Sequence, residues 1–167
     1  MDFKNYSTKS YKKGEIIQRA GDKKLNNFYI KKGLLRSYMI DEHAKETTFM
    51  FASEDWIIGD LLAIFQNTET ELFIDALEDT EVLIINDKIE DLSREELVIG
   101  LNKLLVRVGV LQNRILMQMS SSAIVRYNYF IKLYPNMVQR IPQKIIASYL
   151  GITPQALSRI KGDIKKK

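Results

Sequence analysis

The 167-residue sequence contains no cysteine and only one histidine, His43. Without thiolates the chain cannot form disulfides, hold an iron–sulfur cluster or build a thiolate zinc site. A haem group would need an axial ligand such as histidine. His43 lies in the polar stretch 41–45, DEHAK, where solvation is the simplest expectation. The sequence therefore predicts no metal site and no cofactor.

Long apolar runs are also missing. No run approaches the ~20 residues that are needed to cross a bilayer. Residues 1–6, MDFKNY, lack the apolar segment of a secretion signal. We therefore expect a cytoplasmic protein with no membrane association, which the lack of cysteine also favours.

The residue constellations of an enzyme are missing too. The sequence has no histidine beside a candidate nucleophile, no cluster with metal-ligand spacing and no glycine-rich phosphate loop. Asp60, Glu69 and Glu71 are acidic neighbours in sequence, but surface turns commonly supply such groups. We do not expect catalytic activity.

The charge of the chain is unevenly distributed. Its net charge is +4, yet residues 140–167 hold seven basic residues and one acidic residue. The rest of the chain is therefore slightly acidic. A basic end favours contact with nucleic acid, although a solubilising tail would show the same charge.

Residues 11–86 contain many short segments rich in β-branched and aromatic residues, separated by glycine and aspartate turns. This spacing favours a jelly roll or sandwich, with one helical turn at 61–66. Trp56 is expected to pack inside it, with a place in a pocket wall as the alternative. The expected strands are 16–17, 28–30, 34–40, 47–51, 56–58, 72–74 and 81–85.

Residues 95–119 change to a helical period and predict a helix about 37 Å long. Its apolar residues form two rows, which implies two surfaces to cover. One row can lie on the barrel and the other favours a second subunit, with a core helix in a monomer as the alternative. Arg107 and Arg114 interrupt the pattern, so a regular coiled coil is not expected. The dimer-facing residues are predicted to be Leu97, Leu101, Leu105, Val108, Gln112, Ile115 and Met119.

Residues 142–164 have the pattern of a helix-turn-helix. A helix at 123–134 should end before Pro135. Pro142 suits a first helical position, Gly151 a turn with positive φ, and Thr153 an N-cap. The small, turn and core positions of the motif are filled by Ala147, Gly151, Ile152, Leu157 and Ile160. An ordinary pair of packed helices is the alternative.

In such a motif the second helix enters the major groove, where early side chains reach base edges. Gln155 could pair with adenine and Arg159 with guanine, because both side chains bond bidentately. The candidate base contacts are Thr153, Gln155, Ser158 and Arg159, and the candidate phosphate contacts are Arg140, Gln143, Lys144 and Lys161.

From residue 11 to residue 164 the sequence resembles the Crp/Fnr family of transcription regulators. The resemblance rests on KGEII at 13–17, AGD at 20–22, FYIKKG at 28–33, GD at 59–60 and ALEDTEV at 76–82, together with the C-terminal motif. It implies a cytoplasmic homodimer that binds pseudo-palindromic double-stranded DNA and recruits or blocks RNA polymerase.

The resemblance also implies an α+β architecture in three parts. Residues 1–93 would form a double-stranded β-helix (jelly-roll) sensor barrel, and residues 94–122 a dimerisation helix. Residues 123–167 would form a winged-helix-like helix-turn-helix domain with a minimal wing, because only residues 162–167 follow the last core positions of the recognition helix. Only ten residues precede residue 11, where the resemblance begins, so the family's leading helix should be short or missing.

The chain departs from the family where a cyclic nucleotide would bind. Cyclic-nucleotide sensors hold the phosphate with an arginine followed by serine or threonine. The equivalent stretch here, NTETEL at 67–72, has no arginine and two glutamates, which repel phosphate. We expect no useful affinity for cyclic AMP or cyclic GMP. The barrel would then take an unknown small-molecule effector, or none, at Gly59, Asp60, Leu61, Thr70 and Glu71.

Two functions remain open on the sequence alone. The first is a homodimeric, sequence-specific transcription regulator with an altered sensor barrel. The second is a module that binds a small ligand or a protein and whose helix-turn-helix does not read DNA. The basic C-terminal part favours the first, and steep salt dependence of DNA binding would separate them.

Overall fold

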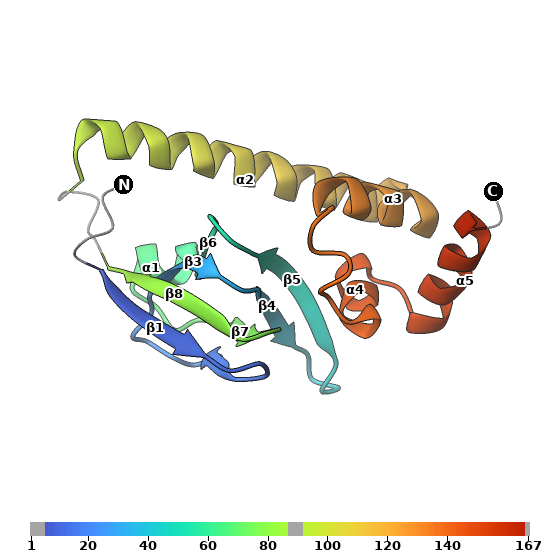
Figure 1. The fold of residues 1–167 in the computed structure, drawn as a ribbon, viewed down its shortest axis with the longest axis horizontal. Helices are drawn as coiled ribbons and strands as arrows, with labels where there is room; N and C mark the ends of the chain where they lie inside the picture. Colours follow the sequence, from blue (N-terminus) through green and yellow to red (C-terminus); the bar gives the residue numbers. More distant parts are fainter. Residues whose placement is uncertain (1–5, 87–91, 166–167) are drawn as a thin grey trace.

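The computed structural model describes residues 6–86 and 92–165 (Figure 1). An N-terminal block of antiparallel strands is followed by one long helix and three shorter helices. The strands are β1 (Ser7–Tyr11), β2 (Ile16–Gln18), β3 (Asn27–Lys32), β4 (Leu35–Ile40), β5 (Glu46–Ala52), β6 (Ile57–Ile58), β7 (Phe73–Ala76) and β8 (Thr80–Ile85).

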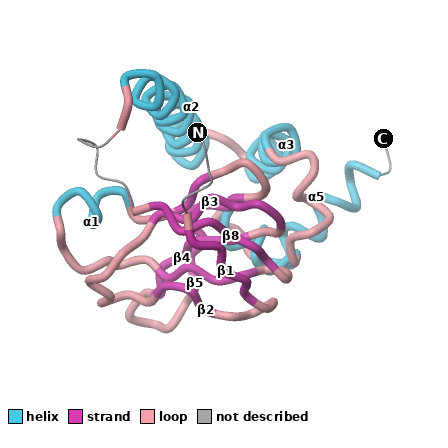
Figure 2. The backbone as a smooth tube through the Cα atoms, turned by 60° about the vertical axis from the view of Figure 1, so that its left-hand side comes forward, coloured by secondary structure: helices cyan, strands magenta, loops and turns pink. Residues whose placement is uncertain are grey.

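The strands form two four-stranded antiparallel sheets, ordered β1-β8-β3-β6 and β2-β7-β4-β5. Apolar side chains from both sheets meet in a shared core that includes Phe28, Ile30, Leu35, Ile74 and Val82. This arrangement confirms the predicted jelly-roll-like barrel (Figure 2).

Strand β1 was not predicted. It pairs along its whole length with β8, from Ser7 opposite Ile84 to Tyr11 opposite Thr80. Four of its five residues are exposed, and only Tyr11 is buried. A strand at the edge of a sheet with so little burial shows no apolar alternation in its sequence, which is why the prediction missed it.

A tight turn before β4 depends on Gly33. Its φ is +109°, and a Cβ there would lie 2.6 Å from the Thr80 Cα. Only glycine fits such a turn against a neighbouring backbone. Because the turn lies so close to Thr80, the Thr80 hydroxyl accepts a hydrogen bond from the Leu34 N–H at 3.1 Å.

The long helix α2 (Arg94–Ser120) begins with a capping box, in which the Ser93 hydroxyl accepts from the Glu96 N–H and the Glu96 carboxylate accepts from the Ser93 N–H. Figure 1 shows α2 running along one side of the barrel. The prediction of a long helix at 95–119 is confirmed.

The two sides of α2 differ from the expected pair of apolar rows. Its barrel-facing side is half-buried and carries two arginines among apolar residues, at Arg107, Val110, Leu111, Arg114 and Met117. The expectation of an apolar row on the barrel is therefore only partly right. The other side is exposed and mostly apolar, and it holds all seven residues predicted to face a second subunit.

Three helices follow α2: α3 (Ala123–Leu133), α4 (Gln143–Leu150) and α5 (Pro154–Lys165). Gly151 ends α4 in the left-handed conformation, with φ +66°, as its place in the turn predicts. The Thr153 hydroxyl accepts from the Ala156 N–H at 3.2 Å and caps α5. Pro142 is one position earlier than expected, because it is the N-cap residue of α4.

Four aromatic rings join the barrel to these helices. Phe51 of β5 packs against three rings: Phe130 of α3, Tyr134 at the C-terminal end of α3, and Tyr149 of α4. The ring centroids are 5.2–6.1 Å from that of Phe51. The three helix-side rings also contact one another. This aromatic cluster is part of one hydrophobic core that spans β-strands and C-terminal helices.

In the described part of the chain, no helix is long and apolar enough to cross a membrane.

Candidate functional site

The residues predicted to line a ligand pocket lie around the short helix α1 (Leu61–Gln66). This helix confirms the predicted helical turn at 61–66. Asp60 caps this helix, because one carboxylate oxygen accepts from the Ala63 N–H at 3.2 Å. Its other oxygen accepts from the Thr70 hydroxyl at 2.7 Å. Both oxygens of Asp60 therefore bond to groups of the chain itself.

Thr70 is the centre of this network. It is only 2% exposed, and its hydroxyl oxygen also accepts from the Gln18 side-chain amide at 3.3 Å and from the Leu72 N–H at 3.0 Å. Thr70 thus holds the 67–72 segment against β2. These hydrogen bonds give Asp60 and Thr70 a structural role at this end of the barrel.

The other residues of the predicted pocket surround this network. Gly59 packs so closely on β3 that a Cβ would lie 2.4 Å from the Asn27 Oδ1. Leu61 and Glu71 are exposed. The structure thus brings the five predicted residues to one end of the barrel, where Glu69 also pairs with Lys23 at 3.3 Å.

One functional candidate at this end was not predicted. Arg107 of α2 donates from Nη2 to the Gly59 carbonyl at 3.4 Å. Burial lowers the pKa of the Arg107 guanidinium, and the nearby Asp60 carboxylate opposes that shift. The sequence marked Arg107 only as a break in an apolar row, because its partner is 48 positions away.

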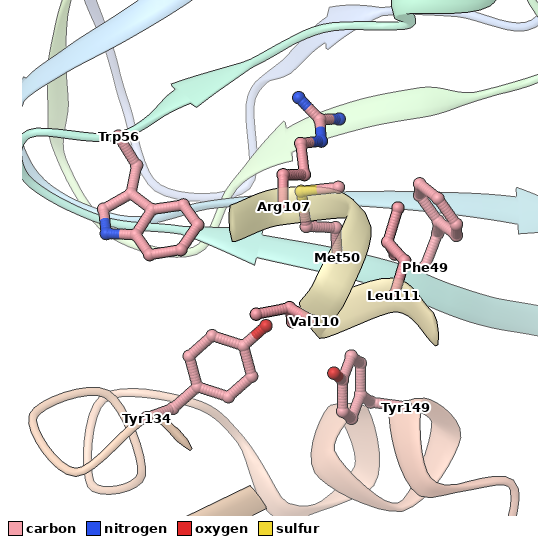
Figure 3. A pocket seen from close by; sticks show the side chains of 8 residues that line it. All are labelled: Phe49, Met50, Trp56, Arg107, Val110, Leu111, Tyr134 and Tyr149. Carbon is pink, nitrogen blue, oxygen red and sulfur yellow. The ribbon is translucent and has the colours of Figure 1, made fainter. Parts of the chain in front are cut away.

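A narrow cavity lies between the barrel, α2 and the C-terminal helices (Figure 3). Tyr134 and Tyr149 point toward Val110 and Leu111 of α2, and Trp56 lines the same cavity. Trp56 is half-buried and also packs against the barrel core. Both expectations for Trp56, core packing and a place in a pocket wall, describe it.

Seven of the eight predicted nucleic-acid residues lie on α4, on α5 or in the turn between them. Leu157 is fully buried, which turns the opposite side of α5 outward. The predicted base contacts Thr153, Gln155, Ser158 and Arg159 are all exposed. Gln143 and Lys144 at the start of α4 are exposed as well, and Lys161 is half-buried. Lys166 and Lys167 lie outside the described residues.

Arg140, the eighth predicted nucleic-acid residue, faces the barrel instead. Its guanidinium donates to the Glu54 carboxylate at 2.9 and 3.0 Å, to Glu78 at 3.2 Å and to the Gly33 carbonyl at 3.0 Å. These bonds to Arg140 lower the pKa of Glu54 to about 2. Because its donors are engaged by the barrel, the assignment of Arg140 as a phosphate contact is corrected. It joins the segment before α4 to the barrel.

Two further contacts fix α4 on the barrel. The Ser148 hydroxyl donates to the Glu46 carbonyl at 2.8 Å and accepts from the Thr48 N–H at 2.9 Å. Arg114 of α2 donates to the carbonyls of Phe49, Thr48 and Tyr149, and its guanidinium lies 4.1 Å from the centre of the Tyr149 ring. Backbone carbonyls of β5 thus hold both α2 and α4 against the barrel. A sequence pattern does not reveal contacts of this kind, because any residue type supplies a backbone carbonyl.

Comparison with solved structures shows the same fold in several proteins. FixK2 from Bradyrhizobium japonicum superposes with a TM-score of 0.80 and 15% identity, covering 96% of this chain and 85% of FixK2. TTHA1359 from Thermus thermophilus, described as a transcriptional regulator of the CRP/FNR family, gives 0.76 and 16%, covering 96% and 86%. A mutant of CooA from Carboxydothermus hydrogenoformans gives 0.74 and 22%, covering 98% and 78%.

The search against curated proteins found no match. The family model for the cyclic nucleotide-binding domain matches residues 8–95, which is more than half of the chain. The match covers both sheets and ends at the start of α2. The chain therefore belongs to the cyclic nucleotide-binding domain family.

Proposed function

We propose that the protein is a cytoplasmic, homodimeric transcription regulator of the Crp/Fnr type that binds double-stranded DNA in a sequence-specific way. The observation that carries this proposal is the surface of α5. Thr153, Gln155, Ser158 and Arg159 are exposed together on a helix whose other side is held by Leu157. Two of these side chains, Gln155 and Arg159, are of the types that can bond a base edge bidentately.

The turn between α4 and α5 supports assigning the pair as a helix-turn-helix. Gly151 in the left-handed conformation and the Thr153 cap set α5 at an angle to α4. Gln143, Lys144 and Lys161 flank the recognition surface and are the proposed phosphate contacts, without Arg140. The charge of residues 140–167 supports this end as the DNA-binding one.

The proposed division of labour follows the three parts expected from the sequence. Residues 1–93 form the sensor barrel, residues 94–122 the dimer helix and residues 123–167 the DNA-binding domain. The exposed apolar side of α2 supports pairing with a second copy, because large apolar surfaces of this kind mark association sites. Two recognition helices would then meet major grooves about 34–36 Å apart, with RNA polymerase as the further partner.

The sensor barrel is proposed not to respond to cyclic AMP. Both oxygens of Asp60 are engaged within the chain, and Glu69 and Glu71 bring negative charge near the predicted pocket. The second candidate function, a ligand- or protein-binding module without DNA recognition, draws support from the tight docking of α4 on β5.

The experiment that tests the proposal is fluorescence anisotropy with DNA from upstream of the protein's own gene and a shuffled DNA of equal length. A series of salt concentrations is measured with and without cyclic AMP. Tighter binding to the upstream DNA, a steep loss with salt and no change with cyclic AMP are expected. Equal binding to both DNAs at every salt concentration would favour the second candidate function.

A further inference from the structure

The outward side of α2 carries a row of side chains spaced alternately by three and four residues. This spacing is the heptad pattern of a helix that packs against a second helix. Arg107 and Arg114, which interrupt the apolar pattern of the sequence, bond to the barrel and stay out of this row. We call the row the α2 seam, and its members are Val98, Leu101, Leu105, Val108, Gln112, Ile115 and Met119.

The α2 seam is apolar except at one position. Its six apolar side chains are exposed, from 50% at Val108 to 79% at Met119. Gln112 is exposed as well and forms no hydrogen bond within the described residues. A contiguous apolar surface of this kind marks an association site. A partner that covers it must also satisfy the Gln112 amide, because a buried amide without a hydrogen bond is costly.

A second copy of the same helix fits this surface in size and in chemistry. Helix α2 has 27 residues and is therefore about 40 Å long. One third of its circumference, drawn at the radius that water reaches, amounts to about 550 Å² per copy and about 1,100 Å² for two copies. A specific interface needs about 1,000 Å². A two-fold axis along the seam brings the same side chains from both copies, so apolar residues meet apolar residues.

The position of Gln112 distinguishes the two ways in which such helices can pair. In a parallel, in-register pair each seam residue faces its own counterpart. Two Gln112 amides then meet, and each can donate to the other and accept from it. Gln112 lies seven positions before Met119, and Leu105 lies seven positions after Val98. An antiparallel pair that overlaps along the whole seam would therefore bury each Gln112 against a leucine.

We propose that Gln112 selects the orientation and register of the α2 pair. Two copies associate in parallel, with their Gln112 side chains hydrogen-bonded to each other across the two-fold axis. A polar pair of this kind lowers the affinity below that of two leucines and disfavours every arrangement in which an amide faces an apolar side chain. The inference rests on the proposed homodimer and adds the residue that fixes its geometry. Parallel pairing places both α5 helices at one end of the dimer, as recognition of a single DNA site requires.

Single cysteines can report the orientation, because the natural chain has none. Val98→Cys and Met119→Cys change the two ends of the seam in separate full-length chains. The chains are equilibrated in a glutathione buffer and analysed by electrophoresis. In the parallel pair each variant forms a disulfide with its own copy, since facing seam positions come within disulfide reach. In an antiparallel pair neither variant does so, and only a mixture of the two variants becomes cross-linked.

Gln112→Leu, made in both cysteine variants, tests the residue itself. Because Gln112 is exposed in the single chain, the change should leave the fold intact. Loss of the amide should lower the dissociation constant of the dimer about tenfold or more. The mixture of the two cysteine variants should then also cross-link between opposite ends of the seam. Gln112→Asn keeps an amide and should keep strictly parallel pairing. Asn113→Leu makes a similar change at an exposed neighbour outside the seam and is the matched control.

The outcomes separate this inference from the homodimer on which it rests. A wild-type chain that stays monomeric at micromolar concentration in light scattering would overturn both. A wild-type dimer that cross-links only between opposite ends of the seam would leave the homodimer in place and overturn the role of Gln112. A Gln112→Leu dimer that stays strictly parallel would do the same.

Discussion

Nη2 of Arg140 donates to Oε1 of Glu54 at 2.9 Å, across 86 positions of sequence. Nη1 of Arg140 donates to the second oxygen of the same carboxylate at 3.0 Å. This bidentate pair joins the barrel to the segment before α4, and it makes the docking of the C-terminal helices sensitive to acid.

The pH dependence follows from the pKa of Glu54, which is lowered from 4.5 to about 2. A lowered pKa means that the pair stabilises the folded state above the ordinary pKa of glutamate and loses this effect as the pH falls toward 2. Arg140→Met should lower the free energy of unfolding by about 1–2 kcal/mol at pH 7. The difference from wild type should shrink between pH 4.5 and 2.5 in urea unfolding. A constant difference over that range, as expected for the control Arg94→Met, would contradict this account.

The aromatic cluster predicts a large cost for truncating its central ring. Phe51 is fully buried, so Phe51→Ala should lower the free energy of unfolding by about 3–5 kcal/mol. Phe65 of α1, which is 80% exposed, is the matched control and should change it by less than about 0.5 kcal/mol. Chemical denaturation measures both. Equal effects of the two changes would show that the cluster does not hold the helices on the barrel.

Base reading and phosphate contact can be separated by two single changes. Arg159→Ala should weaken binding to the preferred DNA by about 1–3 kcal/mol and reduce the preference over shuffled DNA. Lys144→Ala should weaken binding to both DNAs alike and reduce the slope against the logarithm of salt concentration by about 1. Salt-dependent anisotropy measures both. If Arg159→Ala leaves the preference unchanged, α5 does not read the sequence as proposed.

The exposed side of α2 predicts the oligomeric state. Leu105→Glu places a charge in the middle of the proposed dimer surface and should convert dimers to monomers at micromolar concentration. Val106→Glu makes the same chemical change at an equally exposed neighbour outside that row, and it should leave the dimer intact. Light scattering during gel filtration gives the mass. A wild-type monomer, or the same loss with both variants, would reject this surface.

Cyclic nucleotides should not bind the barrel. Calorimetry with cyclic AMP and cyclic GMP should give no saturable heat at micromolar protein, because segment 67–72 offers glutamates where an arginine is needed. Micromolar affinity would mean that Arg107, the guanidinium beside Gly59, takes the phosphate. Arg107→Gln would then abolish that binding.

The sequence predicted the barrel, the long helix and the α4–α5 pair because each has a local signal. Alternating apolar residues mark strands that face a core, and Gly151 with Thr153 marks the turn. Strand β1 escaped prediction because an edge strand with one buried residue has no such alternation. The true role of Arg140 was also missed, since its carboxylate partners lie 62 and 86 positions earlier in the chain. Contacts of this kind are set by tertiary packing, and residue type alone suggested a phosphate ligand.

The candidate ligand site shows the same limit. Its five residues do gather at one end of the barrel, as the family pattern suggests. The pattern did not reveal that both carboxylate oxygens of Asp60 accept hydrogen bonds within the chain, from the Ala63 N–H and the Thr70 hydroxyl. Nor did it reveal that Arg107 approaches from α2, because that approach depends on how the helix rotates on the barrel.

Trp56, the only tryptophan of the chain, lines the same cavity as Tyr134 and Tyr149 (Figure 3). Tyrosine emission overlaps tryptophan absorption, so light absorbed by these two rings passes to the indole while they stay close. Undocking of the C-terminal helices would separate donors from acceptor and shift the emission from indole to phenol. The protein thus carries its own optical reporter of the barrel–helix junction, with no label to attach.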